Sequence, residues 1–205
     1  MQSSQRYFMV HKPYGMESQF KENYPSALLG DLPFSFPEGT HAIGRLDKPS
    51  EGLLLLTTNK KITKLLFEST VPHRRTYLVQ VRHTVSEEKL QQLRTGVSIP
   101  VQHGGYYTTP PCEAERAGEP LFPSPKPFPT YGDTTWLLLT ITEGKFRQVR
   151  KMVAAIGHRC IRLIRVAIED MALGNLPPGA VKEVPEDLFF RLLKLQASPT
   201  GKKEG

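Results

Sequence analysis

Four consecutive leucines, at positions 53 to 56, form a short run that is apolar at every residue. Such a run is typical of a strand that is buried on both faces. It follows directly on the loop 44–52, whose sequence GRLDKPSEG begins and ends with glycine. The loop places the Asp47 carboxylate just before a buried strand, where a charge is costly unless it is paired or has a chemical role. This loop is therefore a candidate functional site, and Asp47 needs a cationic partner from elsewhere in the chain.

The basic residues of the chain are unevenly distributed. The 205 residues carry 27 Lys and Arg against 20 Asp and Glu, a net charge of +7, and the segment 144–168 contains seven basic residues and no acidic one. A cationic surface of this kind suits a polyanion, because proteins that neutralise phosphates gain affinity from counterion release. A solvated basic face is the alternative. Here the basic residues alternate with apolar ones, which indicates a structured segment.

Other compositional features narrow the class of protein. The length allows one substantial core or two small subdomains. Cys112 and Cys160 are far apart in sequence, and the six histidines have no ligand spacing, so neither a disulfide scaffold nor a metal site is expected. The N-terminus lacks an apolar signal core and no apolar run reaches membrane-spanning length, so we expect a cytoplasmic protein without a membrane segment.

The hydrophobic pattern predicts an α+β fold with a mainly antiparallel sheet and flanking helices, in one domain over residues 1–195. Helices are expected after Asn59, from Ser86 to Gly96, over 149–156 and over 185–195, and strands over 7–10, 53–57, 76–82, 136–142 and 160–165. Residues 103–130 contain seven prolines and are expected to form a long loop without regular structure. Residues 196–205 are expected to be a disordered tail.

The helix over 149–156 nominates a partner for Asp47. Its apolar residues follow i, i+3, i+4, i+7 spacing, and Gly157 ends it. At about 100° per residue, Arg147 and Lys151 point away from the apolar face, whereas Arg150 lies at its edge. Arg150 is therefore placed for a half-buried ion pair with Asp47.

Three ordered motifs resemble the RsuA/RluB/E/F class of RNA pseudouridine synthases. They are Lys12-Pro13-Tyr14-Gly15, Gly44-Arg45-Leu46-Asp47 and the stretch 143–152, EGKFRQVRKM. The resemblance implies a catalytic fold with two subdomains around a central cleft, acting without cofactor or metal on a uridine of structured RNA. Many members carry an S4-type RNA-binding module in front, and we expect none here. The resemblance is strongest to members that modify large-subunit (23S) ribosomal RNA, and a small-subunit target is the alternative.

The resemblance also implies roles for individual residues. Asp47 is then the catalytic aspartate, Tyr77 the active-site tyrosine and Arg150 the cation that keeps Asp47 ionised. The target base has to be flipped out of the RNA, and Tyr77 offers a ring against it, although a core aromatic is the alternative for Tyr77. Candidate RNA contacts are Lys12, Arg45, Lys145, Arg147, Gln148, Lys151, Arg159 and Arg162. Arg45 is equally consistent with a structural ion pair, and Gln148 with a hydrogen bond inside its own loop.

The sequence departs from the pattern of the class at three positions. Lys145 replaces the usual arginine, an aromatic residue, Phe146, follows it, and Glu169 stands where a glycine is common. These departures put in doubt the RNA contacts near Phe146 and Glu169. We expect a monomeric enzyme with ribosomal RNA as its partner. Two other functions fit parts of the sequence: a non-catalytic protein of ribosome assembly that uses the same basic face, and a glycosidase with Asp47 and Glu51 as its carboxylate pair.

Overall fold

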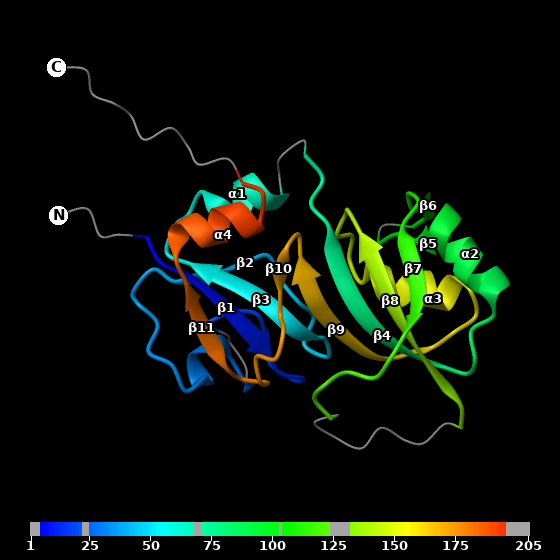
Figure 1. Ribbon diagram of the computed structural model, residues 1–205, viewed down its shortest axis with the longest axis horizontal. Helices are drawn as coiled ribbons and strands as arrows, with labels where there is room; N and C mark the ends of the chain where they lie inside the picture. The colour runs from blue at the N-terminus through cyan, green and yellow to red at the C-terminus, as the bar shows by residue number, and fades with distance from the viewer. Residues whose placement is uncertain (1–4, 22–24, 68–70, 103, 124–131, 196–205) are drawn as a thin grey trace.

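The computed structural model describes residues 5–21, 25–67, 71–102, 104–123 and 132–195. One mixed sheet of nine strands dominates it, with the order β11-β1-β3-β9-β4-β8-β7 (Figure 1). The strands of this path are β1 (Tyr7–Lys12), β3 (Glu51–Thr57), β4 (Arg75–Arg82), β7 (Glu113–Ala117), β8 (Thr134–Ile141), β9 (Cys160–Ile168) and β11 (Val181–Val184). Two short strands lie off the path: β2 (His41–Ile43) pairs with β3, and β10 (Met171–Ala172) pairs with β9.

The remaining elements flank this sheet. A two-stranded hairpin is formed by β5 (Ser98–Pro100) and β6 (Tyr106–Thr108). The helices are α1 (Ile62–Phe67), α2 (Glu87–Thr95), α3 (Gln148–Ala155) and α4 (Glu186–Leu192), with one 3₁₀ turn, η1 (Leu29–Asp31). In Figure 1, α1 and α4 lie with β1, β3 and β11, whereas α2 and α3 lie with the half formed by β4, β7, β8 and β9. None of the helices in the described residues is long and apolar enough to span a bilayer.

The two halves of the sheet meet at a short parallel contact between β3 and β9. These strands pair at only two positions, Glu51 with Ile164 and Gly52 with Arg165, and they run apart from there in Figure 1. The other strand pairs of the described chain are antiparallel. The α+β class with a mainly antiparallel sheet is therefore confirmed, and the junction between its halves falls next to the Asp47 loop.

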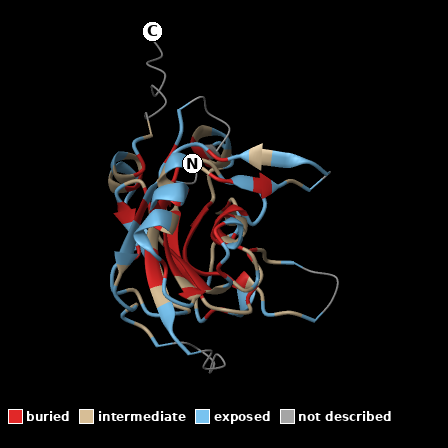
Figure 2. Ribbon diagram, turned by 90° about the vertical axis from the view of Figure 1, so that its right-hand side faces the viewer, coloured by how far each residue is buried: buried red, intermediate tan, exposed pale blue. Residues whose placement is uncertain are grey.

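A hydrophobic core covers each face of the sheet. The four leucines of β3 are all fully buried, with Leu54 and Leu56 in one core and Leu53 and Leu55 in the other. Such alternation is what a strand with two covered faces requires. Figure 2 shows the buried residues gathered in the sheet, with exposed residues on the helices and loops around it. The apolar leucine run is thus explained by burial on both sides.

Capping residues determine both ends of helix α2. Ser86 is its N-cap, with its side chain accepting a hydrogen bond from the Lys89 amide, and Gly96 is its C-cap at a φ of +101°. The expected limits of this helix are confirmed, as are strand β4 and the helix over the apolar residues 149–156.

The expectation of a long irregular loop over 103–130 is wrong in part. Strands β6 and β7 lie within it, because the prolines at 110, 111, 120 and 123 flank these strands and do not interrupt their hydrogen bonding. Residues 103 and 124–130 of that segment, and the expected tail 196–205, lie outside the described residues.

Candidate active site

A cleft of about 670 Å³ opens beside the junction of β3 and β9. Its volume is in the range of pockets that hold a small ligand or a single nucleotide. The loop 44–50 forms one wall, and residues of β4, β9 and the start of α3 form the other. Its charged lining consists of Glu17, Arg45, Asp47, Lys48, Arg75, Lys145, Arg147 and Arg165. Cations therefore outnumber acids in the lining, which favours an anionic ligand.

The backbone on both sides of Asp47 is fixed by hydrogen bonds. The Leu46 amide donates to Ser18 Oγ at 3.0 Å, and Ser18 Oγ donates in turn to the Leu46 carbonyl at 2.8 Å. The Lys48 carbonyl accepts from the Gly15 amide at 2.9 Å. By contrast, the part of the chain that the structure describes offers the Asp47 carboxylate no hydrogen bond or ion pair. The loop is thus rigidly held while its half-buried carboxylate is left available to a ligand.

Lys12 supports the same loop from inside the protein. Its side chain is fully buried, and Nζ donates to the carbonyls of Met16 at 2.7 Å, Pro13 at 3.0 Å and Lys48 at 3.4 Å. Burial lowers the pKa of Lys12 to about 8. The expected contact of Lys12 with RNA needs correction, because an ammonium group enclosed by three carbonyls cannot reach a phosphate.

Arg150 reaches the Asp47 loop, but its guanidinium binds the backbone of the loop. Nη2 donates to the Pro49 carbonyl at 2.9 Å and to Ser50 Oγ at 3.2 Å. The expected ion pair of Arg150 with Asp47 is not among the interactions of the described residues. The physical reason is the position of α3, which brings Arg150 against the far end of the loop, past Asp47.

Arg165 is the more deeply buried of two buried arginines in the cleft lining. It is 3% exposed, Nε donates to the Leu53 carbonyl at 2.8 Å, and Nη2 has no hydrogen-bond partner among the described atoms. Its strand neighbour across the parallel contact is Gly52, at the end of the Asp47 loop. A buried guanidinium with an unused donor is costly unless an anion or acceptor meets it. Arg165 and Asp47 line the same cleft, so Arg165 is the better candidate for the cation that acts with Asp47.

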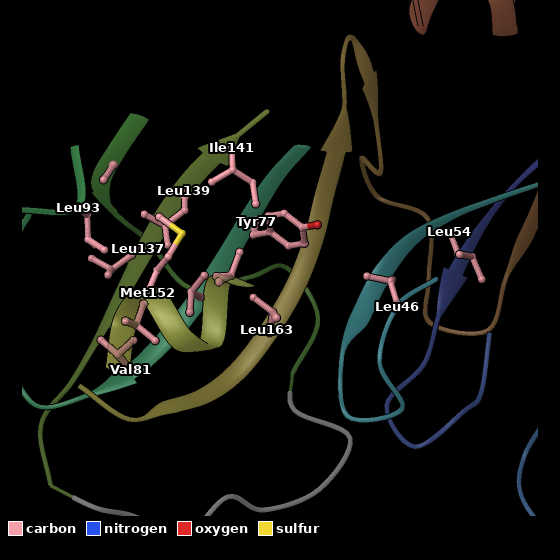
Figure 3. Close-up of a cluster of buried hydrophobic side chains, with 14 of the residues drawn as sticks. Leu46, Leu54, Tyr77, Val81, Leu93, Leu137, Leu139, Ile141, Met152 and Leu163 are labelled. Atoms are coloured by element: carbon pink, nitrogen blue, oxygen red, sulfur yellow. The ribbon is translucent and has the colours of Figure 1, made fainter. Parts of the chain in front are cut away.

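Tyr77 lies beside Arg165. The two residues are direct partners in the antiparallel pairing of β4 and β9, so their side chains share the cleft face of the sheet. Tyr77 is 8% exposed, and its ring packs in a hydrophobic core. Figure 3 shows its hydroxyl on the side of the ring that faces Leu46, the residue before Asp47. The ring is therefore both a core aromatic and a wall of the cleft, so the two interpretations of Tyr77 are compatible.

A buried ion pair lies behind the loop. Glu51 and Arg162 are 1% and 3% exposed, and two hydrogen bonds of 2.8 Å join them. Arg162 also donates to the Phe122 carbonyl at 3.1 Å. The expectation that Arg162 contacts RNA is contradicted by this burial, since both faces of its guanidinium are used inside the protein. Glu51 is equally unavailable as a second catalytic carboxylate.

The other candidate RNA contacts fall into three groups. Arg45, Lys145 and Arg147 are exposed and line the cleft, as a phosphate contact requires. Gln148 is 3% exposed and bonds within its own turn, where Oε1 accepts from the Lys145 amide at 2.9 Å. Lys151 and Arg159 lie outside the cleft lining, and Lys151 Nζ donates to the Pro100 carbonyl at 2.8 Å.

Two buried arginines of the cleft were not identified from the sequence. Arg75 is two positions before Tyr77 on β4 and therefore shares its face, and burial lowers the pKa of its guanidinium. Arg165 interrupts the apolar pattern of β9. An arginine on the inner face of an otherwise apolar strand is the signal that points to each. Within the described chain, no group of three or more His, Cys, Asp or Glu side chains is placed to hold a metal ion.

Known proteins similar to this chain bear on the function of the cleft. The model of the family described as RNA pseudouridylate synthase matches residues 6–155. The chain is 39% identical over 181 residues to "Ribosomal large subunit pseudouridine synthase E" of Xanthomonas axonopodis pv. citri, covering 83% of this chain and 89% of that protein. It is 36% identical over 185 residues to the protein of the same name from Vibrio parahaemolyticus, covering 88% and 74%. A crystal structure of a pseudouridylate synthase superposes with a TM-score of 0.72 and 26% identity, covering 93% of this chain and 74% of that one.

Proposed function

This chain belongs to the RNA pseudouridylate synthase family and is an RNA isomerase, and from that premise we propose that it converts a uridine of large-subunit ribosomal RNA to pseudouridine, with Asp47 as the ionised catalytic group. The observation that carries this proposal is the Asp47 loop. Its backbone is fixed on both sides, while its carboxylate is unpaired within the described residues and lines a cationic cleft. Preorganised geometry of this kind is what a catalytic group requires.

The reaction consumes no other reactant. The bond from ribose C1′ to uracil N1 breaks, the uracil turns, and a bond from C1′ to C5 forms, while the C5 proton is lost and N1 gains one. A carboxylate can assist as a nucleophile, or as a base at the sugar, and in both cases it has to be ionised. Water must be excluded, because it would otherwise trap the sugar and release free uracil.

Arg165 and Tyr77 have complementary roles in this proposal. The Arg165 guanidinium lines the cleft together with Asp47 and offers its unused Nη2 to the carboxylate or to the base. Tyr77 lies next to Arg165 on the neighbouring strand, and its ring supports the flipped base while its hydroxyl is available for proton transfer. Arg150 is a positioning residue, since it holds the Pro49 carbonyl and the Ser50 hydroxyl of the loop.

Exposed cations at the cleft supply the affinity for RNA. Arg45, Lys145 and Arg147 surround the opening with positive charge, and the net charge of the whole chain is +7. Contacts with phosphates position the substrate but carry no sequence information. The proposal of a large-subunit target therefore rests on the names of the relatives and not on the cleft. We further propose that the enzyme acts as a cytoplasmic monomer without a cofactor.

Chemical mapping of pseudouridine across all ribosomal RNA tests the substrate. Cells that lack the gene are expected to lose one modified position in large-subunit RNA, and wild-type enzyme supplied in trans is expected to restore it. Loss of a position in small-subunit RNA would overturn the choice of target. An unchanged map would overturn the proposed function in cells.

Two other functions are less well supported. A non-catalytic assembly protein would have no need for a half-buried, unpaired carboxylate on a fixed loop, and the geometry of Asp47 in the described residues therefore argues against it. A glycosidase would require a second available carboxylate. Glu51 is buried in its pair with Arg162, and Glu17, the other acidic residue of the lining, is paired with Lys48 at 3.7 Å. Mass spectrometry of the reacted RNA separates these functions, because an isomerase preserves its mass whereas a glycosidase releases uracil.

A further inference from the structure

Phe146 is a large apolar side chain displayed at the mouth of the cleft. It is 55% exposed, and it lines the cleft together with Lys145 and Arg147. Its recorded contact is a cation–π interaction, with Lys151 Nζ 5.4 Å from the centroid of the ring. An exposed phenylalanine alone is unremarkable, but this one lies at the opening of a functional cleft and among cations.

The turn that carries Phe146 is held in place. Gln148 accepts from the Lys145 amide on one side of it, and the Lys151 amide donates to the Arg147 carbonyl on the other. Arg147 adopts a φ of +52° and a ψ of +34°, a left-handed conformation that is unfavourable for a residue other than glycine. Such backbone strain persists where the surrounding structure imposes it. The turn therefore presents the Phe146 ring in a defined direction.

Lys151 ties this ring to the β5–β6 hairpin. Its Nζ donates to the Pro100 carbonyl while it lies over the ring, so the ammonium is fixed by two contacts. Near Phe146 the cleft is lined by the cations Lys145 and Arg147. None of the residues between positions 141 and 149 that line the cleft is acidic. An exposed ring bordered by cations matches the two parts of an unpaired nucleotide, a flat base and a phosphate.

We propose that Phe146 stacks on the base of a nucleotide adjacent to the target uridine, while Lys145 and Arg147 bind the flanking phosphates. This inference rests on the proposed function, because a base becomes available for stacking when the neighbouring uridine is flipped into the cleft. Flipping removes one stacking partner from the adjacent base. The Phe146 ring replaces that partner and so favours the flipped state. Phe146 is thus a substrate-binding residue and not a member of the catalytic set.

Binding of large-subunit ribosomal RNA by variants that carry Asp47→Asn tests this inference without turnover. Phe146→Ala is expected to weaken binding by about 5- to 150-fold, the range for loss of one base–aromatic contact, with an unchanged dependence on salt. Phe146→Leu is expected to resemble Phe146→Ala, because it keeps apolar volume but lacks a π-face. Phe146→Trp is expected to bind within about 2-fold of the parent.

Leu121→Ala is the matched control, since Leu121 is 77% exposed and lies outside the cleft lining. It is expected to leave binding unchanged. Ultraviolet crosslinking of the Asp47→Asn protein to the same RNA is a second readout, with Phe146 expected to link to a nucleotide beside the mapped pseudouridine. Equal binding by the Phe146→Ala and parent proteins, or full retention by Phe146→Leu, would overturn the stacking role.

Failure of this inference is distinguishable from failure of the proposed function. The otherwise wild-type enzyme is assayed for pseudouridine on the same RNA. Product formation together with unaltered binding by Phe146→Ala removes the stacking role alone. Absence of product with the wild-type enzyme contradicts the proposed function, whatever Phe146 contributes to binding.

Discussion

Gly52→Ala is predicted to disable the site by separating the two strands that meet beside it. A Cβ on Gly52 would lie 2.2 Å from the Arg165 carbonyl oxygen and 2.7 Å from its amide nitrogen. Because both atoms are backbone, β3 and β9 would have to move apart by roughly 1 Å to restore ordinary contact. The φ of Gly52, +101°, is also unfavourable for alanine.

The expected cost follows from these two effects. Backbone strain in an unfavourable region costs about 1–3 kcal/mol, and overpacking against fixed atoms adds about 1–3 kcal/mol. The free energy of unfolding should therefore fall by about 2–6 kcal/mol. A misplacement of about 1 Å in an active site can cost about 100-fold in rate. We expect at least that loss in the single-turnover rate, because the displaced strand carries Arg165.

Two other glycines provide matched controls. Gly96 has the same φ, +101°, and a Cβ there would also lie 2.2 Å from a backbone oxygen, that of Thr109, but it ends α2 outside the cleft lining. Gly96→Ala should therefore lower stability similarly and leave the rate of the folded protein unchanged. Gly39 has a φ of +81° with nothing within 4 Å of a Cβ, so Gly39→Ala isolates the cost of backbone strain.

The stability of these glycine variants is measured by urea unfolding. Their rate is measured by single-turnover isomerisation. Both are carried out at a temperature where the variant is folded. A Gly52→Ala protein that is as stable as Gly39→Ala, or that retains the wild-type rate, would show that β3 and β9 accommodate the added Cβ without displacement. An equal loss of rate in Gly96→Ala would show that instability alone, and not displacement at the site, lowers activity.

Three further predictions concern the buried charges. Glu51→Gln leaves Arg162 without its counter-charge and is expected to cost about 3–5 kcal/mol of stability by urea unfolding; a cost as small as that of opening an exposed surface pair would contradict it. Arg165→Lys keeps a positive charge but loses the planar donor geometry of the guanidinium. The single-turnover rate should therefore fall at least about 10-fold with little change in RNA affinity. An unchanged rate would exclude Arg165 from the site. Burial lowers the pKa of Lys12 to about 8, below its ordinary value of 10.5. Between these two pH values the unfolded chain binds more protons than the folded protein. The free energy of unfolding therefore rises with pH over this interval, by at most about 3 kcal/mol. Urea melts from pH 8 to 10 should show this rise relative to Lys12→Met, and parallel curves would contradict the burial of a charged Lys12.

The elements that the sequence predicted well are those set by local patterns. The leucine run of β3, the alternation of β4 and the caps of α2 each depend on residues close together in the chain. Asp47 could be identified for the same reason. Its carboxylate lies in a glycine-bounded loop next to an apolar strand, and a charge so close to a buried strand is unfavourable unless it has a role.

The residues that surround Asp47 could not be predicted in this way. Helical periodicity placed Arg150 at the edge of its apolar face, and the structure does bring it to the loop. Which atoms it meets depends on how α3 packs against the sheet. Arg165 lies beside Tyr77 only because β4 and β9 pair in one register, and a shift of one residue would turn Arg165 to the other face.

The predictions of RNA contacts by Lys12 and Arg162 were wrong because both side chains are buried. Lys12 and Arg162 look like surface cations in the sequence, since both occur in motifs rich in basic and turn residues. Their burial depends on acceptors distant in the chain, such as the Lys48 carbonyl and the Glu51 carboxylate. The prolines at 110, 111, 120 and 123 misled the prediction because they flank strands and do not interrupt them.

We propose Asp47 as the ionised catalyst of an isomerisation of RNA. Single-turnover reaction of wild-type protein and of Asp47→Asn with large-subunit ribosomal RNA, read by chemical mapping of pseudouridine, tests it most directly. The wild-type protein is expected to form pseudouridine at one position and release no uracil, while Asp47→Asn binds the RNA with similar affinity and forms none. Pseudouridine formed by Asp47→Asn at the wild-type rate would contradict the account.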